Sequence, residues 1–273
     1  MLTEEQIRLF GEDGFILIPD VFDSAELEAL RGGLSEVFAE LGPHRVLEAG
    51  TGVVRGVHGV HATHPLFGAL ARLPRLVEPA RQLLDDEVYV HQFKINAKLA
   101  LVGEVWEWHQ DFRFWRDEDG MPAPHALSAA VFMDRVDEFN GPLMVVPGSH
   151  REGVYETTVQ EDADWSRTLS AKMKYSLTAE TLARATRERG IVAPKGESGS
   201  VLLFHSNILH GSVPNMSPNN RTLVLISYNG VRNRLGEVPA PRPEFLASRD
   251  FTPLGTVADD ALLALPHAAA GRA

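Results

Sequence analysis

The chain contains no cysteine among its 273 residues. Disulfide bonds, thiolate zinc sites, iron–sulfur clusters and cysteine nucleophiles are therefore excluded. It also lacks an apolar run of the roughly 18 residues that a membrane-spanning helix needs. Its first ten residues, MLTEEQIRLF, are acidic where an export signal is basic and then apolar. The sequence therefore predicts a soluble, cytoplasmic protein.

Positive charge is also scarce. The chain has 26 lysines and arginines against 37 aspartates and glutamates, a formal net charge of −11 with neutral histidine. Nucleic acid, an anionic membrane surface and a polyanionic substrate are poor main partners for such a chain, because like charges repel. Hydrophobic residues make up 44% and charged residues 23% of the chain. These are the ordinary values of a globular protein.

The chain opens on a short helix and a strand-like run. Thr3 and Gln6 have the spacing of a capping box, which predicts a helix that begins after Thr3 and ends near Gly14. Residues 15–19, with the sequence FILIP, have the composition of a short strand.

Two further helical regions are predicted before residue 87. The first can be capped by Asp23 or Ser24, and its leucines recur at helical spacing. The second, about residues 64–84, contains Pro74 and Pro79. Because proline interrupts the hydrogen bonds of a helix, we expect two shorter helices there.

The composition changes at residue 87. Residues 88–98, VYVHQFKINAK, are rich in β-branched and aromatic side chains, and Gln92, Lys94 and Asn96 alternate with apolar residues. A strand with one polar face is expected. Further strands are predicted at 127–133, 143–146, 200–204 and 223–228, separated by glycine- and proline-containing turns.

Helices first and many short strands later predict an α+β fold with a β-sandwich or barrel core. Residues 160–190 look helical and polar, as an insertion into the β framework. Residues 256–273 are rich in alanine and are expected to form a loosely held tail.

The segment WEWHQDFRFW is the first indication of chemistry. His109 and Asp111 are two residues apart, so in an extended segment both side chains point to the same side and can reach one ion. An HxD pair is weak evidence by itself. Tryptophans and phenylalanines surround it, and such a cluster can also be an ordinary aromatic core segment.

The second indication is FHSNILHGS, in which His210 ends a strand-like run and Gly211 permits a tight turn. Two histidines and one carboxylate occupy one face of an octahedral ion and leave three positions open, an arrangement typical of non-haem Fe(II) oxygenases. Arg221 begins the next strand, eleven residues after His210. Its guanidinium could hold a carboxylate by two parallel hydrogen bonds.

These motifs resemble those of the phytanoyl-CoA dioxygenase superfamily of Fe(II)- and 2-oxoglutarate-dependent oxygenases. The segments HQFKINAK, WHQDFxFWxxEDGMPxPH, EFNGPLMVVPGSH, HGSxPNMSP and APRPEFLASRDFTPL are similar to those of its bacterial branch that hydroxylates free amino acids. The resemblance runs from about residue 10 to residue 255. It implies a single domain over residues 1–273 with a double-stranded β-helix (jelly-roll) core, divided as mainly helical (1–86), core (87–230, insertion about 155–190), substrate-side segment (231–255) and loose tail (256–273).

The resemblance also implies roles for individual residues. The iron ligands would be His109, Asp111 and His210. The 2-oxoglutarate contacts would be Arg221, Ser212, Ser128, Asn96 and Gln92. The substrate contacts would be Arg242, His58 and Trp115. The implied reaction uses Fe(II), 2-oxoglutarate and O2 to hydroxylate an unactivated C–H bond of a small free L-amino acid, with proline or a branched aliphatic such as leucine favoured, as in natural-product biosynthesis.

Alternatives remain open at this stage. The substrate could be carrier-tethered, acidic, or a compatible solute such as ectoine. If the strand continues past Asp111, Arg113 points toward the site and could bind an acidic group or pair with a nearby carboxylate. The protein could also be a catalytically silent jelly-roll binding protein, or a zinc hydrolase, although the latter gives Arg221 no role. Chlorination is disfavoured, because halogenating relatives lack the carboxylate that Asp111 supplies. A second metal site at His58, His61 and His64 is not expected.

Overall fold

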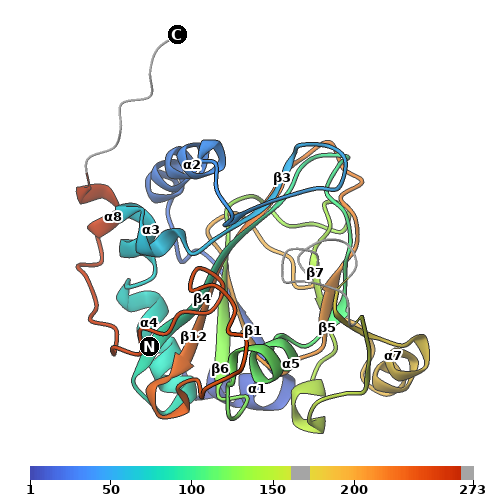
Figure 1. Cartoon of the computed structure of the whole chain (residues 1–273). Coiled ribbons are helices and arrows are strands. Elements are labelled where there is room, and N and C mark those ends of the chain that lie inside the picture. The colour runs from blue at the N-terminus through green and yellow to red at the C-terminus, as the bar shows by residue number, and fades with distance from the viewer. Residues whose placement is uncertain (161–172, 266–273) are drawn as a thin grey trace.

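A computed structural model describes residues 1–160 and 173–265. Two antiparallel sheets face each other, and helices cover the outer face of the larger one (Figure 1). The large sheet contains, in spatial order, β1 (Phe15–Ile18), β10 (Val201–His205), β6 (Ala126–Phe132), β12 (Arg221–Gly230), β4 (Val88–Lys98), β3 (Val54–His58) and β2 (Arg45–Leu47). The small sheet contains β5 (Trp106–His109), β11 (His210–Ser212) and β7 (Leu143–Val145), and β8 (Thr157–Val159) pairs with β9 (Tyr175–Leu177). This is the expected jelly-roll core with added helices.

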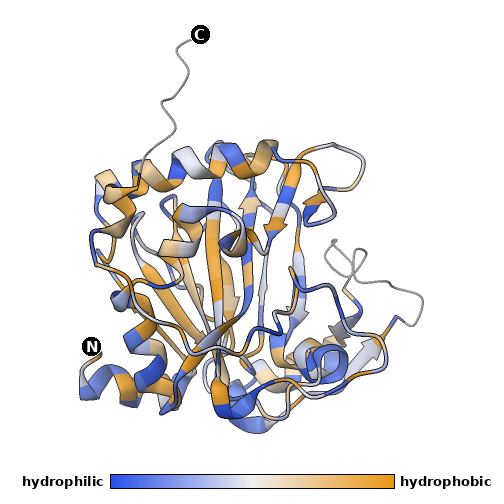
Figure 2. Ribbon diagram, turned by 60° about the vertical axis from the view of Figure 1, so that its left-hand side comes forward, coloured by the Kyte–Doolittle hydropathy of each residue, from blue (hydrophilic) through white to orange (hydrophobic). Residues whose placement is uncertain are grey.

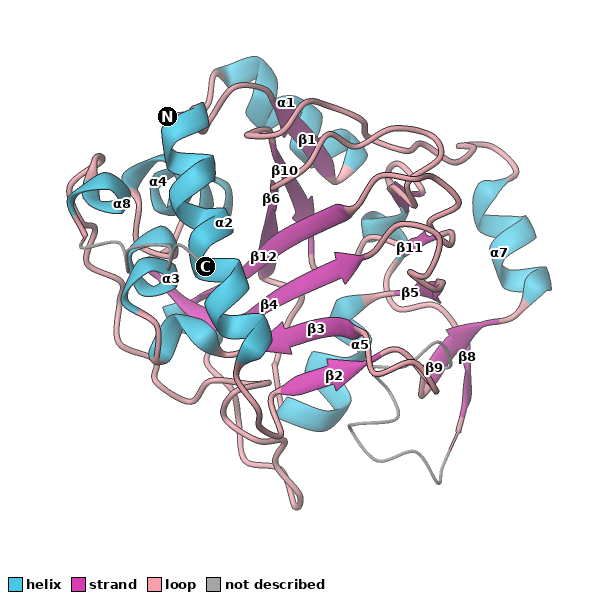
Figure 3. Cartoon of the chain, turned by 90° about the horizontal axis from the view of Figure 1, so that it is seen from above, coloured by secondary structure: helices cyan, strands magenta, loops and turns pink. Residues whose placement is uncertain are grey.

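The helices lie mainly on one side of the core. The view from above separates the helical layer, the large sheet and the small sheet (Figure 3). The helices are α1 (Glu4–Asp13), α2 (Ser24–Ala39), α3 (Pro65–Leu70), α4 (Pro74–Leu84), α5 (Asp111–Phe114), α7 (Ala179–Thr186) and α8 (Ala261–Ala264). Single turns are η1 (Val60–Ala62), the π-helical η2 (Trp115–Asp119), η3 (Ser149–Glu152) and η4 (Val231–Asn233). Within the described ranges, none of these helices has the length and apolar character that crossing a membrane requires.

The helix starts follow the capping signals. Thr3 caps α1 in a complete capping box, and Gly14, at φ +82°, ends it in the left-handed conformation that glycine adopts without strain. Asp23, and not Ser24, caps α2. The two shorter helices expected over residues 64–84 are α3 and α4, and Pro74 occupies the first turn of α4. Pro79 lies inside α4 and does not end it. Pro79 is on its buried face, and packing there offsets the lost hydrogen bond.

The large sheet is apolar on both faces near its centre. On β12, Val224 and Ile226 pack into the cluster under the helices, whereas Leu223 and Leu225 belong to the cluster between the sheets. Figure 2 shows the corresponding concentration of apolar residues along the central strands. The period of two in a strand therefore gives β12 two buried faces, one toward the helices and one toward the small sheet.

Strand β4 has the polar face that the sequence predicts. Phe93 and Ile95 pack under the helices, and Gln92, Lys94 and Asn96 point into the space between the sheets. The polar face of β4 therefore borders the cavity that the two sheets enclose.

Two expectations about chain segments need correction. The segment expected to be helical near 160–190 contains strand β9 as well as helix α7, and residues 161–172 lie outside the described ranges. The tail is not loose at its start, because Leu262 of α8 is fully buried and the Val257 N–H donates to the Arg72 carbonyl oxygen at 3.1 Å. Residues 266–273 again lie outside the described ranges.

Candidate metal and substrate site

The register of the small sheet brings the two predicted histidines together. His109 is the last residue of β5 and His210 the first of β11, and the two are direct partners across the antiparallel pair. Their ring centroids are 4.1 Å apart. The sequence suggested that His210 ends a strand, but in the structure it begins one. Residues 101 positions apart meet because adjacent strands hold them side by side.

Asp111 reaches the same place from the start of α5. The chain is extended at Gln110 (φ −120°, ψ 125°), so His109 and Asp111 point to one side, but the helix begins at Asp111 and no strand continues beyond it. Gln110 points the opposite way. Its side-chain amide donates to the carbonyl oxygens of Gly153 and Asn207 and accepts from the Tyr155 N–H. These buried hydrogen bonds of Gln110 fix the backbone between His109 and Asp111.

The three side chains have the donor set and orientation that a divalent ion requires. The ligand atoms of His109, Asp111 and His210 lie within 4.8 Å of one another, and each residue is only 5% exposed. In each histidine, Nδ1 lies against a backbone carbonyl oxygen, that of Glu107 at 2.7 Å and that of Ile208 at 3.1 Å. Donation from Nδ1–H leaves Nε2 unprotonated and aimed at the shared centre.

The charges around His109, Asp111 and His210 favour the binding of a cation. Burial raises the pKa of Asp111, but the charge of Lys94 and the two neighbouring histidines outweigh it, so the pKa lies well below its ordinary value. The Lys94 ammonium is 3.4 Å from Oδ1 and 3.5 Å from Oδ2 of Asp111. Burial lowers the pKa of His210 to about 3, so its imidazole is neutral at physiological pH. One carboxylate and two imidazoles suit Fe(II).

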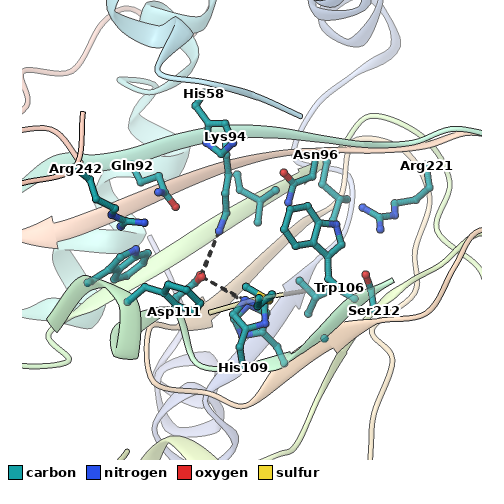
Figure 4. Close-up of a pocket in the computed structure, with 18 residues that line it drawn as sticks. His58, Gln92, Lys94, Asn96, Trp106, His109, Asp111, Ser212, Arg221 and Arg242 are labelled. Carbon is teal, nitrogen blue, oxygen red and sulfur yellow. Dashed lines mark hydrogen bonds and ion pairs between the residues drawn. The ribbon is translucent and has the colours of Figure 1, made fainter. Parts of the chain in front are cut away.

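The triad opens into a cavity between the two sheets. Figure 4 shows Arg242 and Arg221 at opposite ends, with His109 and Asp111 between them. The lining residues are His58, Gln92, Lys94, Asn96, Trp106, His109, Asp111, Phe114, Trp115, Leu143, Met173, His210, Gly211, Ser212, Arg221, Leu223, Leu225 and Arg242. Most of the predicted site residues thus meet in one cavity.

The Arg221 end holds a buried arginine that has no carboxylate partner among the described residues. Arg221 is 2% exposed and donates through Nε and Nη2 only to the Gly141 carbonyl oxygen, at 3.1 and 2.7 Å. Lys98 is its direct partner across β4 and β12 and donates to the Val213 carbonyl oxygen. Burial and the neighbouring cations lower the pKa of Arg221 to about 9 and that of Lys98 to about 6. Arg221 therefore stays charged at neutral pH, and no described carboxylate lies within salt-bridge distance of it, so this end of the cavity can receive an anion.

The Arg242 end is different, because its cation is already paired. Arg242 donates from Nε to Oδ1 and from Nη2 to Oδ2 of Asp119, at 2.8 and 2.6 Å. Gln92 lies beside it (Figure 4). Trp115 is 1% exposed and forms the wall of this end. The two ends of the cavity therefore offer different electrostatic environments.

Two predicted site residues are not brought to the cavity. Ser128 is fully buried and its hydroxyl pairs with that of Ser227 at 2.8 Å across β6 and β12. Arg113 points away because α5 replaces the expected strand. Its Nε is 2.7 Å from Oδ2 of Asp117, and its guanidinium lies over the Tyr175 ring. Pairing with a nearby carboxylate was one of the two roles considered for Arg113.

The side chains of His58, His61 and His64 do not converge on one point. The triad is the one group of three metal-binding side chains in residues 1–160 and 173–265. His61 stacks on Phe93 at 5.2 Å, and Nε2 of His64 is 3.2 Å from a carboxylate oxygen of Glu36. His58 alone of the three lines the cavity.

His58 should make the stability of the protein depend on pH. Its side chain is 3% exposed, and burial, together with the charges of Lys94 and Arg242, lowers its pKa from 6.5 to about 3. Between these two values the unfolded chain binds a proton that the folded chain does not, so stability falls as pH falls through this window. Between pH 6 and pH 4, we expect His58→Gln to lower the slope of the unfolding free energy against pH by roughly 1.4 kcal/mol per pH unit.

The measurement is urea unfolding of both variants at several pH values. His64→Gln serves as the control, because His64 is partly exposed and lies outside the cavity. A slope that is unchanged in His58→Gln contradicts the burial of a neutral imidazole at this position.

Sequence reasoning missed three cavity residues or partners. Lys94 could have been found, because it alternates with Gln92 and Asn96 in the polar face of β4. Trp106 lies in the aromatic segment before His109, which gave no indication of which ring would line a cavity. Asp119 had no signal at all, since its partner Arg242 is 123 residues away.

The fold and the site together define a class of protein: a jelly-roll with a two-histidine, one-carboxylate centre, the architecture of the non-haem Fe(II) oxygenases. Comparison with protein families places the chain within it. The model of the phytanoyl-CoA dioxygenase (PhyH) family matches residues 10–223. The chain belongs to this family, which confirms the resemblance, and it is a 2-oxoglutarate- and Fe(II)-dependent dioxygenase.

Characterised relatives match over nearly the whole chain. L-proline trans-4-hydroxylase of Streptomyces griseoviridis is 40% identical over 267 residues, which cover 96% of this chain and 98% of the relative. Ectoine dioxygenase of Sphingopyxis alaskensis is 40% identical over 261 residues, which cover 91% of this chain and 83% of the relative. Both relatives are named as oxygenases of small molecules.

Solved structures show the same fold. EctD from S. alaskensis, in a structure with bound Fe, is 35% identical and superimposes with a TM-score of 0.80, covering 94% of this chain and 87% of EctD. The structure of EctD with 2-oxoglutarate and 5-hydroxyectoine has a TM-score of 0.80 at 36% identity and covers 94% of this chain and 86% of EctD.

Proposed function

We propose that this protein hydroxylates an unactivated C–H bond of a small free L-amino acid, with proline or a branched aliphatic such as leucine favoured. One oxygen atom of O2 enters the amino acid as a hydroxyl group. The other oxygen atom enters succinate, which forms together with CO2 from 2-oxoglutarate. Fe(II) held by His109, Asp111 and His210 would supply the oxygen chemistry.

The protein's own side chains would bind and orient the two organic molecules. At one end, Arg221 would hold the distal carboxylate of 2-oxoglutarate, and Ser212 and Asn96 line the cavity on the same side. At the other end, Arg242 would hold the carboxylate of the amino acid against Trp115. Gln92 lies beside Arg242, so we assign it to the substrate and not to 2-oxoglutarate. His58 completes this end.

The observation that carries the proposal is the contrast in charge between the two ends. Arg221 has no described carboxylate partner, and an anion such as 2-oxoglutarate would supply the missing negative charge. Arg242 and Lys94 are each paired already, with Asp119 and Asp111. The substrate end is therefore close to neutral, which suits a zwitterionic amino acid better than a dianion.

Exclusion of water is the second contribution of the chain. The rings of Trp106, Phe114 and Trp115 and the side chains of Leu223 and Leu225 line the cavity around the triad. They would hold one C–H bond near the reactive centre and keep water from it. Their shape would select the size of the substrate side chain.

The test is succinate formation by protein reconstituted with Fe(II) under anaerobic conditions and then given 2-oxoglutarate and O2. Free amino acids from a panel are added one at a time, and the masses of the products are measured by mass spectrometry. The proposal expects one amino acid to stimulate succinate formation and to gain the mass of one oxygen atom. Succinate formation that no free amino acid stimulates would overturn the substrate assignment.

A second candidate function is hydroxylation of a compatible solute such as ectoine. It is favoured by the 40% identity with the ectoine dioxygenase of S. alaskensis. Ectoine also carries one carboxylate that Arg242 could bind, so the same panel must include it. A gain of one oxygen atom on ectoine, with no amino acid converted, would select this candidate.

Replacing Arg242 with alanine should weaken the binding of the amino acid selectively. Loss of a charge-assisted hydrogen bond costs about 1.5–3 kcal/mol, which corresponds to a rise in KM for the amino acid of about 10- to 100-fold. KM for 2-oxoglutarate should change by less than about twofold, since Arg242 lies at the opposite end of the cavity (Figure 4). Steady-state kinetics with each component varied in turn will measure both values.

The matched control is Arg234→Ala, an exposed arginine in the same segment. It should leave both KM values unchanged. Equal rises in the two KM values for Arg242→Ala would show that Arg242 does not act at the substrate end.

A further inference from the structure

Asp119 is the buried carboxylate behind the substrate-binding arginine. It is fully buried, and Arg242 is 9% exposed. Asp119 binds the Nε and Nη2 edge of the guanidinium. Among the described residues, Nη1 of Arg242 donates to no partner, and the side chain points into the cavity beside Gln92 (Figure 4). One edge of the guanidinium is thus held by the protein and the other is left for a ligand.

Asp119 is itself held in place from several directions. It is the last residue of the π-helical turn η2, whose first residue is the cavity wall Trp115. The next residue, Gly120, has φ +80°, and the Gly236 N–H donates to its carbonyl oxygen at 2.8 Å. A Cβ at position 120 would lie 2.8 Å from the Gly236 carbonyl oxygen, so only glycine fits this turn. One short turn therefore positions both the wall and the carboxylate.

His91 extends the arrangement to β4. Its Nε2 lies 3.3 Å from Oδ2 of Asp119, and its ring meets Trp115 edge-on at 4.8 Å. His91 and Asp119 are both fully buried. Burial raises the pKa of Asp119, but Arg242 and His91 outweigh it and lower the pKa to about 2. Asp119 is therefore ionised at neutral pH and can pair with the charged guanidinium of Arg242.

Stability alone does not explain such a pair. Taking two charges out of water costs several kcal/mol per ion, and apolar residues of similar volume are often as stabilising as a buried ion pair. The pair does fix a planar guanidinium in one orientation, since two parallel hydrogen bonds allow it no rotation. An arginine held in this way loses little conformational entropy when a carboxylate binds to its free edge.

We propose that Asp119 is a positioning residue for substrate recognition: it holds Arg242 with the Nη1 edge facing the cavity and thereby makes binding depend on the substrate's carboxylate. Asp119 does not touch the substrate. It also balances the charge of Arg242, so that the substrate end favours a zwitterion over a second molecule of 2-oxoglutarate. This inference rests on the proposed function, in which Arg242 binds the substrate.

The kinetic test compares an amino acid with its amide. L-proline and L-prolinamide, and L-leucine and L-leucinamide, differ in the carboxylate alone among the groups that Arg242 can bind. In the unmodified protein, KM for the amide should exceed that for the amino acid by at least about tenfold. In Asp119→Asn, which keeps the volume and removes the charge, we expect this ratio to fall below about threefold, with KM for 2-oxoglutarate changed less than twofold.

A purely structural role predicts a different result. Loss of stability or general distortion would raise both KM values together and leave the amide to amino acid ratio as in the unmodified protein. An unchanged ratio in Asp119→Asn therefore overturns the proposal. Asp119→Glu, which keeps the charge on a longer side chain, should restore part of the ratio. If Asp119→Asn does not fold, Asp119→Glu replaces it in the test and should lower the amide to amino acid ratio below that of the unmodified protein. An unchanged ratio in Asp119→Glu would then overturn the proposal.

A second measurement does not depend on turnover. In protein labelled with 15N-arginine, the Nε–H of Arg242 should give an NMR signal that exchanges slowly with water, assigned by its loss in Arg242→Lys. Asp119→Asn should speed this exchange at least about tenfold, and unchanged exchange overturns the proposal. Asp117→Asn is the control, because Asp117 lies in the same turn but pairs with Arg113 and Arg116 outside the cavity. If no amino acid is converted by the unmodified protein, the proposed function fails, while the exchange measurement still decides whether Asp119 positions Arg242.

Discussion

His109→Ala should abolish both iron binding and turnover. Its Nε2 is aimed at the centre of the triad, and Nδ1 is committed to the Glu107 carbonyl oxygen. Removing one of three ligands leaves two donors, too few for a stable site in water. Since a bound metal contributes several kcal/mol to catalysis, we expect 2-oxoglutarate consumption to fall at least about a thousandfold. The measurement is iron bound per chain after anaerobic loading and desalting, followed by succinate formation.

The fold should survive this substitution, because Gln110 continues to anchor the backbone beside position 109. Circular dichroism and thermal unfolding of the metal-free variant will check this. His64→Ala is the matched control: it removes a histidine that also has a carboxylate neighbour, on the far side of the large sheet. A folded His109→Ala variant that keeps one iron per chain and its activity would remove the triad assignment.

Arg221→Ala should have the largest effect on the use of 2-oxoglutarate. The guanidinium is buried beside Lys98 and has no described carboxylate partner, so a bound carboxylate would form charge-assisted hydrogen bonds in a site shielded from water. Two such bonds at about 1.5–3 kcal/mol each correspond to a rise in KM for 2-oxoglutarate of at least about 100-fold. KM for the amino acid should rise far less.

Arg221→Lys keeps the charge but not the planar fork, and it should recover only part of the loss. The control is Arg135→Ala, an exposed arginine that pairs with Glu197. Kinetics at saturating amino acid and calorimetric binding of 2-oxoglutarate to the Fe(II) protein without O2 give two independent measurements. An Arg221→Ala variant with an ordinary KM for 2-oxoglutarate would require another residue to hold the distal carboxylate.

Local signals in the sequence were sufficient for the elements with regular patterns. Thr3 and Asp23 cap their helices through contacts three residues away. Strand β4 was predicted over residues 88–98 because its alternation is long and uninterrupted. In each case the information lies within a few residues of the structure that it determines.

Strand β7 of the small sheet was predicted, but its neighbours β5 and β11 carried no comparable pattern. β5 and β11 have four and three residues, too few for a period of two to stand out. Their place is set by pairing between His109 and His210, which are distant in the sequence. The change from strand to helix at Asp111 also depends on a distant contact, the bond from the Phe112 N–H to the Ser206 carbonyl oxygen.

The site was predictable to the extent that its residues carry recognisable chemistry. The histidines, Asp111 and Arg221 stand in motifs whose spacing suggests an iron centre and a carboxylate site. Ser128 does face the space between the sheets, on the same side of β6 as Ala130 and Phe132. The register of β6 and β12 sets it opposite Ser227, whose hydroxyl pairs with its own, so Ser128 does not line the cavity. The pairing of Asp119 with Arg242 joins two segments that share no pattern.

The two faces of β4 also differ in how readily they tolerate substitution. Phe93 and Ile95 are packed among helices, where a change of volume is costly, whereas Gln92, Lys94 and Asn96 border the cavity. Substitutions at the cavity positions can change which molecule is accepted without disturbing the packing that keeps the strand in place. A lineage built on this strand can therefore acquire new substrates while its scaffold stays the same. A directed-evolution library would begin at the codon of Gln92, since Lys94 pairs with Asp111 and Asn96 lies on the side proposed for 2-oxoglutarate.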